Sequence, residues 1–186
     1  SEAGLKYFVL GALSSGFMLF GISLIYGYSG SVMFDSVAMA VYAMLELDGV
    51  VNQGLLLGLV FLLAGLAFKI SAVPFHMWTP DVYEGSPTTV TAFFSVVPKL
   101  AAFAILIQLL FGPFAALYSE WSQIVWFMAA ASMVLAAFAA LRQNNIKRLM
   151  AYSSISNVGF ALIGVTAGWV GLEAVVTYLV IYMVGT

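Results

Sequence analysis

Cysteine is absent from the 186-residue sequence, and histidine occurs once, at His76. The chain therefore has no thiol for a disulfide, for nucleophilic catalysis or for a zinc or iron–sulfur site. A single imidazole also cannot supply a histidine-rich metal site or a pair of haem ligands. We expect no cofactor in this chain, so any redox chemistry coupled to it must take place elsewhere.

Charged side chains are also scarce, at 8% of the residues, whereas soluble domains average about 25%. Hydrophobic residues make up 63% of the chain, and the mean hydropathy is +1.08. Lipid rather than water must therefore solvate the outward faces, which predicts an integral membrane protein in a lipid bilayer. The net charge of -2 and the lack of a basic stripe argue against a nucleic-acid partner.

Long apolar runs recur along the sequence. A spanning helix needs about 20 mostly apolar residues, and a sixth such run begins near Leu172 after five complete ones. The five predicted spans cover residues 5–28, 55–76, 90–111, 124–141 and 149–167. Residues 32–50 carry apolar side chains at helical spacing together with acids, which predicts a short amphipathic helix at the membrane surface. The expected fold is an all-α, polytopic bundle of transmembrane helices.

The few basic residues outside the spans predict the orientation of the chain. Lys6 begins the first span, and Arg142, Lys147 and Arg148 lie between the fourth and fifth. Because cytoplasmic loops carry an excess of Lys and Arg, we place these four bases inside, in a bacterial inner membrane. The sequence begins without a methionine and ends within an apolar run, so we expect it to be an internal part of a longer protein.

Two lysines, Lys69 and Lys99, lie inside predicted spans near mid-membrane depth. A charged lysine there costs at least about 2.5–3.5 kcal/mol, so such residues usually face a protein interior or a wet cavity and take part in function. Burial weakens the hold of a lysine on its proton and brings it toward reversible protonation, which arginine cannot provide. We predict proton transfer by both lysines. The alternative is that each reaches an interface or forms a static ion pair.

Prolines stand close to both lysines, at Pro74 and Pro98. A proline removes one helical hydrogen bond, and broken helices at mid-membrane are typical of transporter ion sites. We predict a helix break at each proline, with a simple packing kink as the alternative.

Residues 74–87 form a proline-punctuated turn that is rich in aromatic and acidic groups. His76 titrates near neutral pH and is a candidate proton relay toward Lys69, unless it is a hydrogen-bonded histidine that orders the turn. Asp81 and Glu84 are expected to cap the helix that begins near residues 86–88, since acids favour the positive end of a helix. Gathering of protons at the mouth is a second interpretation of these acids.

Four sequence motifs carry a resemblance to a known family. They read GLKYF with GALSSG at residues 4–16, AFKISAVPFH at 67–76, WTPDVYEG at 78–85 and NIKRLMAYSSIS at 145–156. By these motifs the chain resembles the antiporter-like membrane subunits of the proton-pumping NADH:quinone oxidoreductase, respiratory complex I. It is most similar to the bacterial subunit N group, the counterpart of mitochondrial subunit 2, because Lys99 stands where the larger relatives have histidine.

The resemblance implies a fold of two inverted five-helix repeats, with residues 1–111 in the first and 112–186 in the second. It implies a broken helix near Lys69–Pro74 and a connecting role for Lys99 on the next helix. The glutamate that partners Lys69 in the family would precede Ser1, and a second broken helix with its own lysine would follow Thr186.

The function that we predict is proton translocation by a redox-free subunit of NADH:quinone oxidoreductase, driven by ubiquinone reduction in neighbouring subunits. The expected partners are the other membrane subunits, lipid, protons and water. Three alternatives stay open at this point: a multisubunit cation/proton antiporter subunit, a passive membrane scaffold and a quinone-reducing enzyme. The lack of cysteine and the lone histidine argue against the last of these.

Overall fold

The computed structural model describes residues 2–185, apart from the side chain of Asp48, and this part of the chain is built from helices without a strand. In chain order the elements are α1 (Glu2–Ser29), α2 (Phe34–Asp48), α3 (Gln53–Ile70), α4 (Trp78–Gly85), α5 (Thr88–Phe111), the 3-10 turn η1 (Ala115–Leu117), α6 (Tyr118–Ala140), α7 (Ile146–Thr166) and α8 (Trp169–Gly185). The all-α prediction is confirmed.

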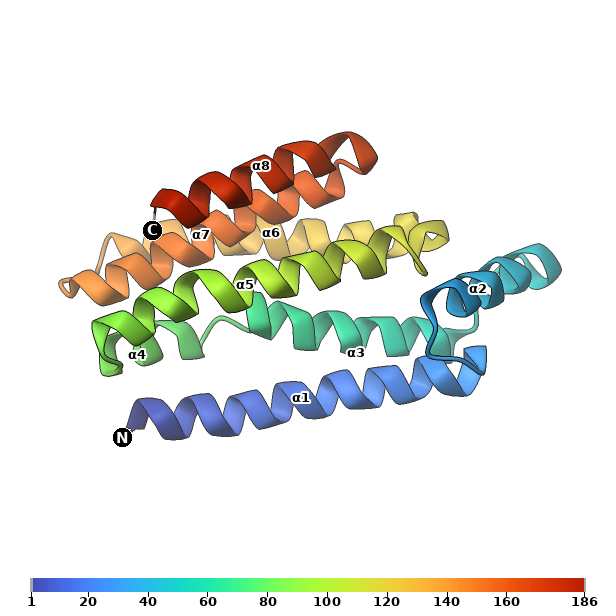
Figure 1. Ribbon diagram of the computed structural model, residues 1–186, viewed down its shortest axis with the longest axis horizontal. Helices are drawn as coiled ribbons and strands as arrows, with labels where there is room; N and C mark the ends of the chain where they lie inside the picture. Colours follow the sequence, from blue (N-terminus) through green and yellow to red (C-terminus); the bar gives the residue numbers. More distant parts are fainter. Residues whose placement is uncertain (1, 186) are drawn as a thin grey trace.

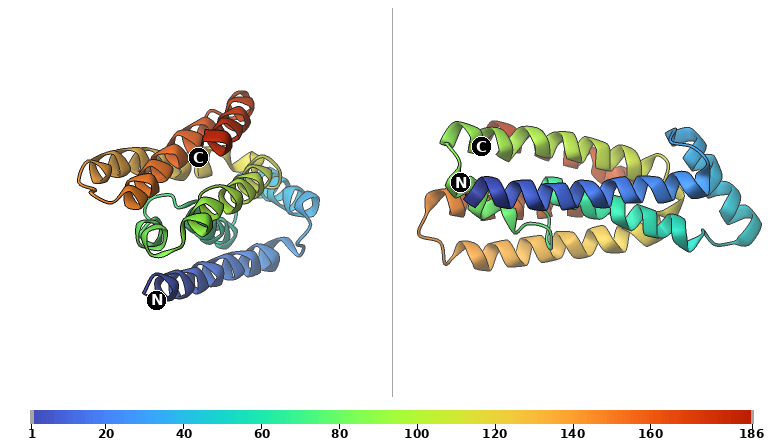
Figure 2. Two further views of the ribbon diagram at one scale, coloured as in Figure 1. Left: turned by 60° about the vertical axis from the view of Figure 1, so that its left-hand side comes forward. Right: turned by 90° about the horizontal axis from the view of Figure 1, so that it is seen from below.

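The long helices run side by side along one axis, with both chain ends at one end of the bundle and α2 at the other (Figure 1). Five segments are long and apolar enough to cross a membrane: α1, α3, α5, η1 with α6, and α7. Figure 1 and the left view of Figure 2 place α3 and α5 in the middle, with α1 on one side and α6, α7 and α8 on the other. The chain is a multi-pass membrane protein, as its hydropathy predicted.

The core is centred on α3. In the most apolar 18-residue stretch of this helix 56% of the residues are buried, against 17% in that of α1. Leucines such as Leu62 and Leu66 of α3 and Leu106 of α5 form one cluster with Leu162 of α7. Because lipid is as apolar as leucine, close packing rather than exclusion of water holds these helices together. The bundle therefore fixes the depth and the facing of each polar side chain it contains.

The amphipathic segment is a helix, α2, as predicted. Val37 and Val41 on one of its faces are buried in the core cluster, whereas Met39 and Leu47 on the other sides are exposed. The helix ends at Gly49, whose φ of 67° is in the left-handed region that glycine adopts without strain.

The predicted broken helix near Lys69–Pro74 is also confirmed. The helix α3 ends at Ile70 because Ser71 turns into the left-handed region, with a φ of 65°. The N–H groups of Ser71 and Ala72 close the helix end by donating to carbonyls of the last turn, at 3.1 and 2.9 Å. The expected span to residue 76 was too long, since apolar residues continue past this turn and hydropathy does not register it.

The predicted break at Pro98 is wrong. The helix α5 runs continuously from Thr88 to Phe111, with Pro98 inside it. A proline removes only its own hydrogen bond to the residue four positions earlier, here Phe94, and the bonds on either side keep the segment helical. Only one of the two prolines therefore stands in a break, and the division of the chain into two repeats stays a prediction.

Candidate functional site

Lys99 is enclosed between helices. It lies in α5 with 2% of its surface exposed, and its Nζ donates a hydrogen bond to Oγ of Ser154 in α7 at 2.5 Å. The Ser154 hydroxyl also pairs with the hydroxyl of Tyr182 in α8, at 2.6 Å, which in turn donates to the carbonyl oxygen of Ser95 at 3.3 Å. Lys99 thus begins a chain of hydroxyl groups that joins three helices.

A second polar pair and a small cavity adjoin this chain. The hydroxyl of Tyr178 donates to Oδ1 of Asn157 at 2.5 Å. Asn157 and Tyr178 line a cavity of about 10 Å³ together with Lys99 and Tyr182. That volume is close to the space occupied by one water, about 10–15 Å³ on this measure. Lys99 is therefore surrounded by hydroxyl and amide groups that can both donate and accept hydrogen bonds.

Lys69 occupies the last turn of α3, next to the break, and is half-buried. Within residues 2–185 its Nζ makes neither a hydrogen bond nor an ion pair. The sequence prediction that Lys69 lies beside a helix break is thus met by the geometry, and its ammonium is available to a group outside the described residues.

The break itself is held by side chains from other elements. Trp78 Nε1 donates to the carbonyl oxygen of Phe68 at 3.1 Å, and the N–H of Val73 donates to Oγ of Ser132 in α6 at 2.9 Å. The Ser132 hydroxyl gives the N–H of Val73 a partner outside the helix, as irregular backbone in a membrane requires, and Trp78 adds a second bond to a carbonyl that already accepts from Ser71. Pro74 lies in this segment, and its peptide bond with Val73 is cis.

Polar atoms gather in the break around His76. Its ring is half-buried, and Nδ1 is enclosed without a hydrogen bond, as are Oγ of Ser71 and Oγ1 of Thr79. The carbonyl of His76 accepts from the N–H of Thr79 at 3.0 Å. The position of His76 beside the break suits both the relay and the loop-ordering interpretations, so its role stays a prediction.

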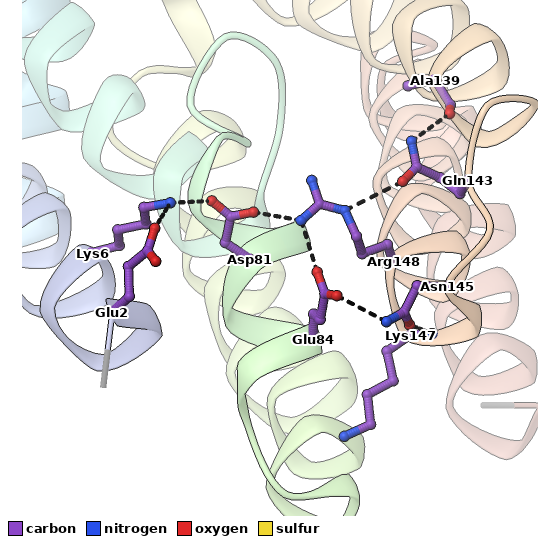
Figure 3. A network of polar contacts seen from close by, with 9 residues as sticks. All are labelled: Glu2, Lys6, Asp81, Glu84, Ala139, Gln143, Asn145, Lys147 and Arg148. Atoms are coloured by element: carbon purple, nitrogen blue, oxygen red, sulfur yellow. Dashed lines mark hydrogen bonds and ion pairs between the residues drawn. The ribbon is translucent and has the colours of Figure 1, made fainter.

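A charged network closes the end of the bundle that holds the start of α1 (Figure 3). Asp81 of α4 pairs with Lys6 of α1 and with Arg148 of α7, at 2.6 Å each, and Lys6 also pairs with Glu2 at 2.7 Å. Arg148 contacts Glu84 at 2.9 Å. The short helix α4 is therefore tied by charge to helices on both of its sides.

These contacts correct the expected role of the two acids. Asp81 and Glu84 do not cap the next helix, since α5 begins after Pro87 without a side-chain cap and both carboxylates turn to the bases instead. The ammonium of Lys6 and the guanidinium of Arg148 hold the pKa of Asp81 below its usual range. Asp81 is therefore ionised at neutral pH, which suits an anchor better than a collector of protons.

Several residues of the site escaped sequence analysis. Neither Ser154 nor Tyr182, which the structure places next to Lys99, was singled out from the sequence. The signal that could have found Ser154 is the run of hydroxyl and amide residues at 153–157 inside an apolar helix. Its hydrogen-bond partner, Lys99, lies 55 positions away in the sequence, and their contact depends on how α5 and α7 pack.

The bundle, its interrupted helix and its buried lysine define a membrane protein of the antiporter-like class. The chain belongs to the family described as NADH:quinone oxidoreductase/Mrp antiporter, transmembrane, whose family model matches residues 1–186. It is 63% identical over 185 residues to the NADH-quinone oxidoreductase subunit N of Parvibaculum lavamentivorans, covering 99% of this chain and 37% of that protein. The chain thus spans little more than a third of the length of that relative.

Solved structures share the fold. Respiratory complex I from Thermus thermophilus contains a chain 38% identical in sequence, with a TM-score of 0.74 over 96% of this chain and 38% of that chain. The Mrp complex from a Dietzia species contains one with a TM-score of 0.85, over 98% of this chain and 33% of that chain. At 24% identity the second likeness shows the common fold alone.

Proposed function

We propose that this chain moves protons across the membrane as part of a subunit of NADH:quinone oxidoreductase. The observation that carries the proposal is the placement of two lysines inside the bundle, Lys69 beside a helix break and Lys99 on a buried chain of hydroxyl groups. Relatives of this chain are subunits of such an enzyme complex. The further partners that we infer are its other membrane subunits and the surrounding lipid.

The contact between Lys99 and the Ser154 hydroxyl suits proton transfer. A hydroxyl group both donates and accepts hydrogen bonds, whereas an ammonium only donates. When Lys99 gives up its proton, its amine gains a lone pair, and Ser154 can rotate its hydroxyl hydrogen to serve that lone pair. The same contact therefore supports the charged and the neutral state, as a reversible carrier requires.

The break gives Lys69 a separate role. Its ammonium is held at the end of a helix inside the membrane, with no partner among the described residues. We infer that a carboxylate elsewhere in the full-length subunit pairs with Lys69 and that loss of this pair releases the proton toward Lys99. The energy comes from quinone reduction in other subunits, so this chain needs no redox centre or cofactor of its own.

The deciding experiment replaces Lys69 by Ala and by Arg in the full-length subunit, within the complex in its native membrane. Both variants should assemble, and both should lose most of the proton pumping measured per NADH oxidised, because Arg keeps the charge but does not release its proton. Arg142→Ala is the control, since that base is exposed in a loop. Normal pumping by assembled Lys69→Ala complex would overturn the proposal.

The same preparation separates the competing functions. A passive scaffold predicts that Lys69→Ala lowers the amount of complex but leaves pumping per assembled complex unchanged. A cation/proton antiporter predicts sodium-dependent transport in membranes that lack the NADH dehydrogenase. The fold shared with the Mrp complex makes the second comparison worthwhile.

A further inference from the structure

Lys99 is buried without a counter-charge. Among the described residues no carboxylate approaches its Nζ: the acids of α4 are paired with Lys6 and Arg148, α3, α5 and α7 contain no acid, and Glu173, the acid of α8, is exposed. The titratable groups that face it are Tyr83 of α4 and two tyrosines of α8, Tyr178 and Tyr182. From α7 it meets only the neutral side chains of Ser154 and Asn157.

The face of an aromatic ring takes the place of the carboxylate. The Nζ of Lys99 lies 5.6 Å from the centroid of the Tyr83 ring. A cation within about 6 Å of a ring face is attracted by the negative centre of the ring, and more strongly where both groups are out of water. Tyr83 is 1% exposed and Lys99 2%, so this contact is shielded from solvent. A neutral amine would gain much less from the ring than the ammonium does.

The helix that carries this ring is set apart from its neighbours. The eight residues of α4 follow the break and are joined to α3 through non-helical backbone. On α4, residues two apart point in different directions. Asp81 turns toward the ion pairs with Lys6 and Arg148, while Tyr83 turns toward Lys99. The ion pairs therefore fix the position of the ring.

We propose that Tyr83 is a positioning residue that stabilises the protonated form of Lys99 through its ring, and that the ion pairs of α4 with Lys6 and Arg148 hold the ring in this place. The inference rests on the proposed function, because it assigns Tyr83 to the same proton transfer.

The test compares Tyr83→Leu with Tyr83→Phe in the full-length subunit, within the assembled complex, over a range of pH. Loss of the ring should move the alkaline limb of pumping to lower pH by about one unit, roughly a tenfold weaker hold of Lys99 on its proton. Tyr83→Phe keeps the ring and should restore the parent profile. The control variant is Tyr152→Leu, which removes a half-buried tyrosine of α7 and should leave the pH profile of pumping unchanged.

An unshifted profile in Tyr83→Leu would overturn the inference, and so would an equal shift in Tyr83→Phe, which would assign the effect to the hydroxyl. If Tyr83→Leu does not assemble, Tyr83→Met fills the space with a flexible chain that has no ring face and is held to the same expected shift. Lys99→Ala, measured in parallel, separates the two proposals. Normal pumping by Lys99→Ala rejects the proposed function, whereas lost pumping with an unshifted Tyr83→Leu profile rejects only the role of Tyr83.

Discussion

At Lys99, the hydroxyl of Ser154 accepts the hydrogen bond of an ammonium whose other described neighbours are apolar, aromatic or neutral polar groups. Hydrogen bonds to charged groups contribute about 1.5–3 kcal/mol, and a buried charge that loses its acceptor keeps the cost of desolvation. The Ser154 hydroxyl is therefore the part of α7 on which the charged state of Lys99 depends most.

Ser154→Ala should weaken proton binding by Lys99 by about tenfold or more, since each 1.36 kcal/mol is one pKa unit. We expect pumping per assembled complex to fall at neutral pH and to recover in part at lower pH. The measurement is the pH dependence of proton uptake in vesicles. Ser153→Ala is the matched control, because that residue is exposed and its hydroxyl accepts only a long hydrogen bond, 3.5 Å, from Nδ2 of Asn157. Equal losses in both variants would contradict the prediction.

Sequence reasoning at this scale located the lysines but not their partners. Lys69 and Lys99 were found by counting residues into each apolar run, which requires no knowledge of packing. The pairing of Lys99 with Ser154 depends on the rotation of α5 against α7, which apolar periodicity does not fix when all faces are apolar. The prediction of a break at Pro98 failed for a related reason, because a proline alone does not reveal whether the surrounding bundle keeps the helix continuous.

Among the elements, α1 and α3 approach each other backbone to backbone at Gly21 and Gly58. A Cβ placed on Gly21 would lie 2.6 Å from the carbonyl oxygen of Gly58 and 2.8 Å from the backbone nitrogen of Leu62. Neither backbone atom can move as a flexible side chain can. Small residues at such crossings let membrane helices pack tightly.

Gly21→Ala should therefore destabilise the α1–α3 pair by about 1–3 kcal/mol, the usual cost of overpacking. Thermal inactivation of the detergent-solubilised complex measures this loss. Gly16→Ala on the same helix has open space around the new methyl group, and it should be neutral or slightly stabilising, since alanine favours the helix. A lower midpoint for Gly16→Ala than for Gly21→Ala would show that the crossing is looser than described.

The elements were the most predictable level of this structure. Hydropathy placed the third span at 90–111, and α5 runs from Thr88 to Phe111. It failed where a backbone turn decides the end, as at Ser71, because the apolar residues of 72–75 continue the signal beyond the last helical turn. The expected capping role of Asp81 and Glu84 was also wrong, because ion pairs between elements distant in sequence leave no local pattern.

For the whole molecule, the charged network unites bases that the orientation argument had placed on one side. Lys6 and Arg148 bind the same carboxylate of Asp81, so both lie at one end of the bundle. The amphipathic α2 lies at the opposite end (Figure 1). The described structure therefore brings these bases to one side of the membrane, and the excess of Lys and Arg in cytoplasmic loops predicts that this side is the cytoplasmic one.

Residues 1–186 contain no cysteine, so single cysteines introduced here will report orientation without background from this part of the subunit. Arg142→Cys, in the exposed loop after α6, should react with a membrane-impermeant thiol reagent only from the cytoplasmic side. Leu47→Cys, on α2 and 84% exposed, should react only from the outer side. Labelling of Arg142→Cys from outside would reverse the orientation.

The break after Ile70 has one more consequence, which is electrostatic. The aligned peptide groups of a helix place about half a negative elementary charge at its C-terminal end. Because α3 ends inside the bundle, that partial charge lies within the membrane, in the same turn as Lys69. No protonation event removes it, so the backbone provides Lys69 with a permanent counter-charge. The carboxylate that we infer for Lys69 therefore adds to a fixed partial charge of the same sign, and only the contribution of the carboxylate changes when that pair is lost.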